Sequence, residues 1–184
     1  MRLVSFLFLL FASGAIEQEP CKPIIWSGSK RLVFEDFCGL PDSLDRYDAR
    51  SFFEVNYDYI IDYDTLSYDI YTLFIRTDSW IKHNDSALVA HERLHFDIGE
   101  IHSRSIKRKL HLLSGKRVDD SVVYNIFLKE RDSQIAADAL FDSETQHGTL
   151  EKQTRDWEKR IKIMLDSLDG YKEPKGNVFV IPKN

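Results

Sequence analysis

The 184-residue sequence contains little glycine, proline or cysteine, with 8, 5 and 2 residues respectively. So few glycines and prolines exclude a collagen-like or low-complexity chain. An excess of positive charge is also missing, because 25 Lys and Arg residues face 30 Asp and Glu residues. At a net charge of −5 we expect no binding of nucleic acid through a generally basic surface. With 43% hydrophobic residues, the chain can bury the core of one domain.

A long hydrophobic run is absent apart from a short one at the N-terminus. Residues 1–15 begin with a positive charge at Arg2, continue with apolar residues and end in small ones. This order is typical of a secretory signal peptide, and the apolar part is about half the ~20 residues that a membrane-spanning helix needs. We therefore predict a signal peptide over residues 1–15 and a single domain over residues 16–184. The mature protein is expected in the periplasm or outside the cell, without a membrane span.

The only two cysteines, Cys21 and Cys38, enclose 16 residues. In an oxidising compartment such a pair persists as a disulfide, and we predict that bridge here. The alternative is a pair of buried thiols. Zinc binding by the two cysteines is not expected, because they lack the paired short spacings of a structural zinc site.

Hydrophobic periodicity indicates strands first and helices later. Residues 53–61 alternate between apolar and polar side chains. After a turn at residues 63–65, the stretch 66–76 is rich in aromatic and aliphatic residues, which predicts a β-hairpin. The residues before this hairpin, 17–49, are rich in turn formers and are expected to be irregular.

From residue 85 onwards the hydrophobic period is helical. We expect a first helix that is capped near Asp85 and ends near Gly115, with its charged residues 93, 97, 100 and 104 on a solvated face. Two further helices are predicted at 119–140 and 149–168, separated by a polar break at 141–148. The expected fold is therefore α+β, an N-terminal antiparallel hairpin or sheet followed by three helices.

The strongest chemical signal is the sequence HERLH at residues 91–95. His91 and His95 lie one helical turn apart on the same side, so that both rings can bind one Zn²⁺. Glu92 lies about 100° around the helix, where it can accept a proton from a zinc-activated water without binding the ion. We predict a zinc site with Glu92 as the general base. The alternative is a pair of hydrogen-bonded core histidines.

A catalytic zinc site needs a third protein ligand. His102 lies about 16 Å from His91 along a straight helix, so it can share the ion only if the helix breaks at Gly99. His147 is better placed, because a side chain in the break at 141–148 can turn back towards a neighbouring helix. Gly148 beside it permits a tight backbone path.

Two carboxylates in the same break, Asp142 and Glu144, are alternatives. Either one can supply an oxygen ligand or accept the outer N–H of a ligand histidine. Residues of this type are also common as helix caps.

The sequence resembles a known family in two blocks. Residues 91–98 read HERLHFDI and residues 141–148 read FDSETQHG. They are similar to HExxH and to a block of the form YDxxTxHG in the bacterial secreted zinc-dependent proteases grouped as domain of unknown function 922. The stretches WS at 26–27 and RLVFEDFCG at 31–39 also resemble the N-terminal part of that family. Phe141 departs from the pattern, which has Tyr at this position.

This resemblance implies a zincin-like fold, a zinc ion, peptidase activity and His147 as the third ligand. The expected function is a secreted or periplasmic zinc metallopeptidase that acts on a peptide or protein substrate. Two alternatives remain open: an amidase that acts on a polymer of the cell envelope, and a zinc-containing binding or assembly module without catalysis. An enzyme would leave a fourth zinc position open to water.

Overall fold

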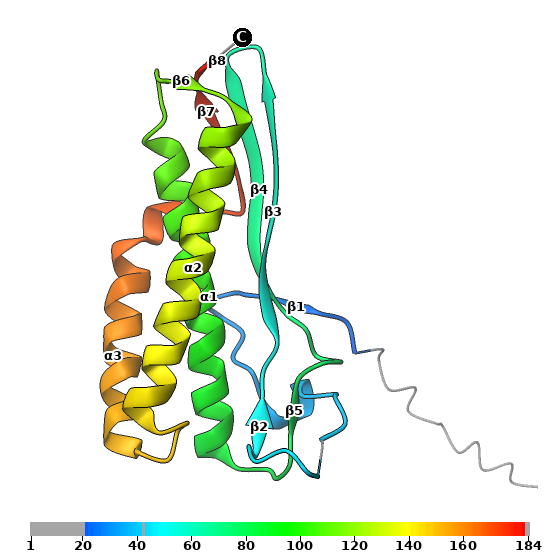
Figure 1. Ribbon diagram of the computed structural model, residues 1–184. Coiled ribbons are helices and arrows are strands. Elements are labelled where there is room, and N and C mark those ends of the chain that lie inside the picture. The colour runs from blue at the N-terminus through cyan, green and yellow to red at the C-terminus, as the bar shows by residue number, and fades with distance from the viewer. Residues whose placement is uncertain (1–20, 42, 183–184) are drawn as a thin grey trace, which may run out of the picture.

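The computed structural model describes residues 21–41 and 43–182, and the predicted signal peptide at 1–15 lies outside them. The α+β prediction is confirmed: an antiparallel sheet built on a long hairpin packs against three helices (Figure 1). In chain order the elements are β1 (Ile24–Ile25), the 3₁₀ turn η1 (Phe34–Asp36), β2 (Ala49–Arg50), β3 (Phe53–Asp62), β4 (Thr65–Phe74), β5 (Trp80–Ile81), α1 (Ser86–His111), β6 (Arg117–Val118), α2 (Asp120–Thr145), α3 (Glu151–Ser167), the 3₁₀ turn η2 (Asp169–Tyr171), β7 (Lys175–Phe179) and β8 (Ile181–Pro182).

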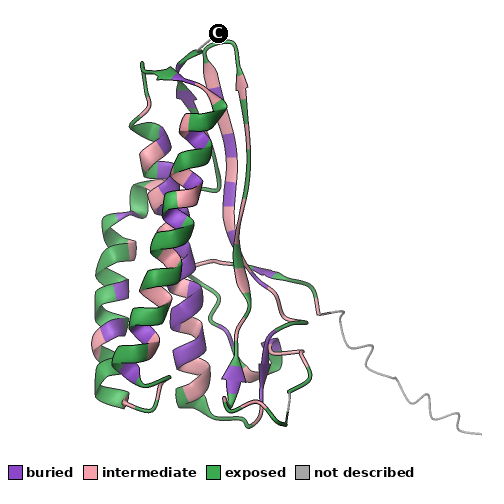
Figure 2. Cartoon of the chain, viewed as in Figure 1, coloured by how far each residue is buried: buried purple, intermediate pink, exposed green. Residues whose placement is uncertain are grey.

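The predicted hairpin forms from β3 and β4, which pair in register from Phe53 and Phe74 to Asp62 and Thr65. Strand β4 is central, because β3 lies along one edge while β1 and β7 pair with the other. Every second residue of β4 is buried, which is the alternation expected of a strand with one face against a core. Figure 2 shows this alternation along β4, beside the helices.

The three helices lie side by side, with α1 in contact with the hairpin and with both other helices (Figure 1). Asp85 caps α1 as predicted, because its side chain accepts hydrogen bonds from the backbone N–H groups of Ala87 and Leu88. The predicted end of the second helix is wrong. Helix α2 continues to Thr145, so of residues 141–148 only the last three lie outside the helix.

Apolar side chains between the layers form separate clusters. One joins β4 and β7 to the C-terminal half of α1 and the start of α2, and includes Leu110 and Phe127. A second lies where the first half of α1 meets the end of α2 and α3, and includes Ile98, Phe141 and Trp157. The second cluster fixes the relative positions of the helix segments that carry the chemical motif.

The predicted solvated face of α1 is wrong in its second half. Glu100 and Arg104 are only 3% and 4% exposed, and they form an ion pair of 2.8 Å between Arg104 Nε and a Glu100 carboxylate oxygen. Thr72 of β4 donates a further hydrogen bond to Glu100. Burial raises the pKa of Glu100, and these partners oppose that rise. The two charges at i and i+4 therefore form a buried ion pair and not the predicted surface pair.

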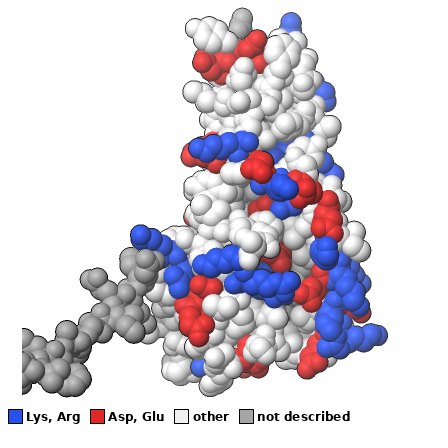
Figure 3. All heavy atoms as spheres, turned by 180° about the vertical axis from the view of Figure 1, so that it is seen from behind, with Lys and Arg blue, Asp and Glu red and all other residues white. Residues whose placement is uncertain are grey.

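The predicted disulfide is confirmed, since Cys21 and Cys38 are bonded. It links the segment before β1 to the start of the loop after η1. On the face drawn in Figure 3, Lys and Arg side chains lie beside Asp and Glu side chains. Among the described residues, no helix combines the length and the apolar character that a membrane crossing requires.

Candidate metal centre

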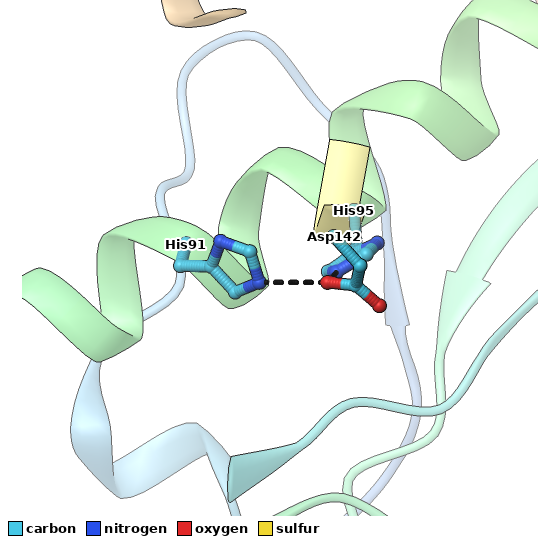
Figure 4. A group of neighbouring side chains, drawn as sticks. All are labelled: His91, His95 and Asp142. Carbon is cyan, nitrogen blue, oxygen red and sulfur yellow. Dashed lines mark hydrogen bonds and ion pairs between the residues drawn. The ribbon is translucent and has the colours of Figure 1, made fainter. Parts of the chain in front are cut away.

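The motif residues His91, Glu92 and His95 lie in the first half of α1, and all three are buried. Helix α2 runs antiparallel to α1, so its end comes beside the start of α1 (Figure 1). Its last turns bring Asp142 against the two histidines (Figure 4). The site is therefore built by two helices that are packed together through the second apolar cluster.

The three side chains point at one another with ligand atoms in close contact. One oxygen of Asp142, Oδ1, lies 3.1 Å from Nε2 of His91 and 3.0 Å from Nε2 of His95. These residues are the group among the described residues whose potential ligand atoms all lie within 4.8 Å of one another. Ligands at 2.0–2.1 Å from a tetrahedral metal ion stand about 3.3 Å apart, which is close to the two distances between Asp142 and the histidines, so the group could hold a metal ion.

A second carboxylate orients His95 from the other side of its ring. Oδ1 of Asp138 lies 2.9 Å from Nδ1 of His95. A carboxylate can only accept a hydrogen bond, so Nδ1 donates to Asp138 and Nε2 donates to Asp142, which requires a ring that is protonated at both nitrogens. A carboxylate behind a ligand histidine is the usual support of zinc sites.

The surroundings of His95 favour positive charge. Burial alone would lower the pKa of His95, but the hydrogen bonds to Asp138 and Asp142 and the charge of Glu92 raise it to about 10. Burial would raise the pKa of Asp142, whereas its hydrogen bonds to the two histidines hold it well below the usual range. A pocket that favours a proton between these groups also favours a divalent cation in its place.

His91 is held by close packing. The ring of Phe141 stacks on it at 4.5 Å, and Gly148 also lies close to it. A Cβ at Gly148 would stand 2.9 Å from Cγ of His91, so only glycine fits here without displacement. Nδ1 of His91 is buried and has no hydrogen-bond partner within the described part of the chain.

Glu92 lines a cleft next to the group formed by His91, His95 and Asp142. Its Oε2 accepts a hydrogen bond of 2.6 Å from the hydroxyl of Ser51, at the end of β2. The cleft encloses about 730 Å³ between residues 46–51, the first turns of α1 and residues 146–149. His91 and His95 line the same cleft as Glu92.

His147 lies at the border of the cleft. Its Nδ1 is 3.4 Å from Oδ1 of Asp142, its side chain is half exposed, and its ring lies 4.8 Å from that of Tyr47. It is not part of the compact ligand group. The structure thus brings Asp142, the alternative oxygen ligand, directly against the two histidines, and a ligand role of His147 stays a prediction.

The backbone around His147 adopts an unusual conformation. Gln146, His147 and Gly148 have φ angles of 48°, 52° and 82°, all in the left-handed region. Such a run costs energy for residues other than glycine, and such strain is often found at functional sites. It turns the chain sharply between α2 and α3 and directs His147 into the cleft.

The other candidate ligands are engaged elsewhere. Glu144 accepts a hydrogen bond of 2.8 Å from the indole of Trp157, and thereby joins α2 to α3. His102 lies 2.8 Å from a carboxylate oxygen of Glu130. Helix α1 continues without a break through Gly99, so His102 does not approach His91.

Sequence reasoning missed Asp138 and Ser51. Asp138 precedes Asp142 by one helical turn, so both face α1 from the same side of α2. A longer predicted second helix would have revealed this spacing. Ser51 follows a two-residue strand and has no local signal of its contact with Glu92.

Comparison with known proteins adds no relative: no family model matches the sequence, and neither a curated protein nor a solved structure matches it.

Proposed function

We propose that the protein is a zinc-dependent hydrolase that cleaves peptide bonds. The observation that carries this proposal is the convergence of His91, His95 and Asp142 through ligand atoms 3.0–3.1 Å apart, next to Glu92 in an open cleft. Two imidazoles and one carboxylate form a donor set that is typical of catalytic zinc and leaves a coordination position free.

In this proposal His91, His95 and Asp142 hold the ion, and Asp138 fixes the ring of His95. Zinc at this position supplies a Lewis acid that lowers the pKa of water and polarises a carbonyl group. Glu92 accepts the proton of the attacking water and later returns it to the leaving amine. Ser51 keeps the Glu92 carboxylate in place through its hydrogen bond of 2.6 Å.

We assign the third ligand position to Asp142 and place His147 beside it. Asp142 is already in contact with both histidines, whereas His147 contacts only Asp142 within the ligand group. The half-exposed ring of His147 is available to a substrate that enters the cleft. This assignment separates two roles that the sequence alone left as alternatives.

A compartment outside the cytosol fits the proposal. The disulfide between Cys21 and Cys38 is of a kind that persists in exported proteins and is rare in the cytosol. We therefore propose that the enzyme acts in the periplasm or outside the cell, on a peptide or protein substrate.

The experiment is a comparison of the mature wild-type protein with Glu92→Gln, both loaded with zinc. We expect the wild type to hydrolyse denatured casein, detected as new peptides by mass spectrometry. Glu92→Gln is expected to keep about one zinc per chain and to lose at least 100-fold in rate, because it keeps the ligands and removes the base. Equal rates for the two proteins would contradict the proposal, as would the absence of hydrolysis by the zinc-loaded wild type.

A further inference from the structure

A second cavity of about 320 Å³ lies between β3, α2 and the middle of α1, next to the metal cleft. Its walls are largely aromatic and aliphatic: Tyr57 of β3 stacks on Phe127 of α2 at 4.0 Å, and Tyr124 and Leu128 line the α2 side. Tyr57 and Tyr124 are 42% and 52% exposed. Large aromatic side chains that remain open to solvent around a concave pocket are typical of a binding site.

The floor of this cavity is polar. His102 and Glu130 both line it, and Nδ1 of His102 lies 2.8 Å from the Glu130 carboxylate. Since a carboxylate only accepts, Nδ1 donates, and the opposite ring nitrogen has no hydrogen-bond partner among the residues that the structure describes. The cavity therefore combines apolar side chains with the oriented pair of His102 and Glu130, and Glu54, Arg131 and Gln134 also line it.

Two features connect this cavity to the metal cleft. Phe53 lines both, so the two spaces are neighbours that share this residue as a wall. On α2, the residues that border the two spaces follow one side of the helix, from Tyr124 and Leu128 to Asp138 and Asp142. A ligand that crosses the metal site and follows α2 would reach the second cavity.

The metal cleft and the second cavity, taken together as one groove along α2, suit an extended chain. Strand β3 pairs with β4 alone among the described strands, so its other edge carries backbone N–H and C=O groups without a strand partner. An extended polypeptide can add to such an edge through main-chain hydrogen bonds. The occupant that fits the groove is therefore a polypeptide in extended conformation.

The distance from the metal site to the second cavity along α1 indicates which residue of the polypeptide would place its side chain in that cavity. His102 follows His95 by seven residues, or about 10 Å along the axis of α1. An extended chain advances about 3.3 Å per residue. We propose that the second cavity binds a bulky apolar side chain of the substrate, about three residues from the bond that is cleaved. This inference rests on the proposed peptidase function and adds a sequence preference to it.

The test measures binding without turnover. Calorimetry measures the affinity of the zinc-loaded Glu92→Gln protein for two unlabelled nine-residue peptides of Ala and Ser. The peptides differ at one position, which is Phe in one peptide and Ala in the other. Burial of a Phe side chain predicts at least tenfold tighter binding of the Phe peptide. Adding Tyr124→Ser or Leu128→Ser should each reduce this ratio to below threefold. Tyr63→Ser, at the 86% exposed hairpin turn, is the matched control and should keep the full ratio.

Equal affinities for the two peptides would overturn the inference, and so would a ratio that neither Tyr124→Ser nor Leu128→Ser reduces. Hydrolysis by the wild type separates this failure from failure of the proposed function. Cleavage of both peptides at equal rates would contradict the proposed role of the second cavity and leave the peptidase proposal standing. A clear binding preference without any cleavage would support the cavity and contradict the peptidase proposal.

Discussion

Phe141 lies almost flat against the imidazole of His91, with ring centroids 4.5 Å apart and planes inclined by 22°. It meets His95 edge-on at 4.8 Å, and its other neighbour is Trp157 of α3 at 5.3 Å. The side chain is completely buried. Residue 141 thus supports both histidines from the apolar side while residue 142 contacts them from the polar side. Both effects come from one turn of α2.

Phe141→Ala should therefore loosen the site as well as the core. We expect a loss of about 3–5 kcal/mol in the free energy of unfolding, measured with urea, because a fully buried aromatic ring is removed. Zinc affinity should fall in the same variant. Leu140→Ala is the control, because Leu140 is 51% exposed and its loss should cost less than about 0.5 kcal/mol. Unchanged zinc affinity in a folded Phe141→Ala protein would contradict this supporting role.

Gly148→Ala tests the close approach to His91. The added Cβ would lie 2.9 Å from Cγ of His91, at a φ of +82°. Gly115→Ala is a matched control, since Gly115 has a φ of +70° but no atom within 4 Å of the added Cβ. Both variants should lose about 1 kcal/mol from the left-handed backbone. Only Gly148→Ala should also lower zinc affinity, and equal affinities in the two variants would count against the predicted clash.

Asp138→Asn tests the support of His95. The variant keeps the shape of the side chain but removes the charge behind Nδ1 of His95. Replacement of such a partner usually lowers metal affinity by about 10- to 100-fold, which competition with a zinc chelator can measure. Asp132→Asn, an exposed position on the same helix, should bind zinc like the wild type. A supporting role of Asp138 would be disproved by equal zinc affinities in the two variants.

The pH dependence of stability tests the buried Glu130. Burial alone would raise the pKa of Glu130, but hydrogen bonds from His102, Lys109 and Ser105 lower it from 4.5 to about 2. A carboxyl group with a lowered pKa in the folded state stabilises the fold above pH 4.5, and this contribution is lost as the pH falls towards 2. The lowering corresponds to about 3 kcal/mol.

Urea unfolding of the wild type and of Glu130→Gln should therefore differ most near pH 5 and converge towards pH 2. Glu151→Gln, at an exposed residue of α3, should follow the wild type throughout. A difference between wild type and Glu130→Gln that stays constant from pH 5 to pH 2 would contradict the lowered pKa.

The sequence predicted the elements that depend on local pattern. The alternation at residues 53–61 and the cap at Asp85 both identify structure that forms as expected. Likewise, the i, i+4 spacing of His91 and His95 places both rings on one side of α1 and into the interior.

Long-range packing decided the features that local pattern missed. The polar residues at 142–145 suggest a break, yet α2 continues through them because Phe141 and Thr145 are buried between the helices. Glu100 and Arg104 have the spacing of a surface pair, but they face β4 and α3. Thr72 donates a hydrogen bond to Glu100, and the carbonyl of Leu165 accepts one from Arg104. The place of Asp142 depends on the length of α2, which periodicity alone did not fix.

The most direct test of the central claim is the zinc content of the mature protein, measured by mass spectrometry after metal-replete purification, in the wild type, Asp142→Ala and His147→Ala. We expect about one zinc per chain in the wild type, most of it lost in Asp142→Ala and most of it kept in His147→Ala. Asp132→Ala should match the wild type. A wild type without zinc, or full zinc retention in Asp142→Ala, would contradict the site formed by His91, His95 and Asp142.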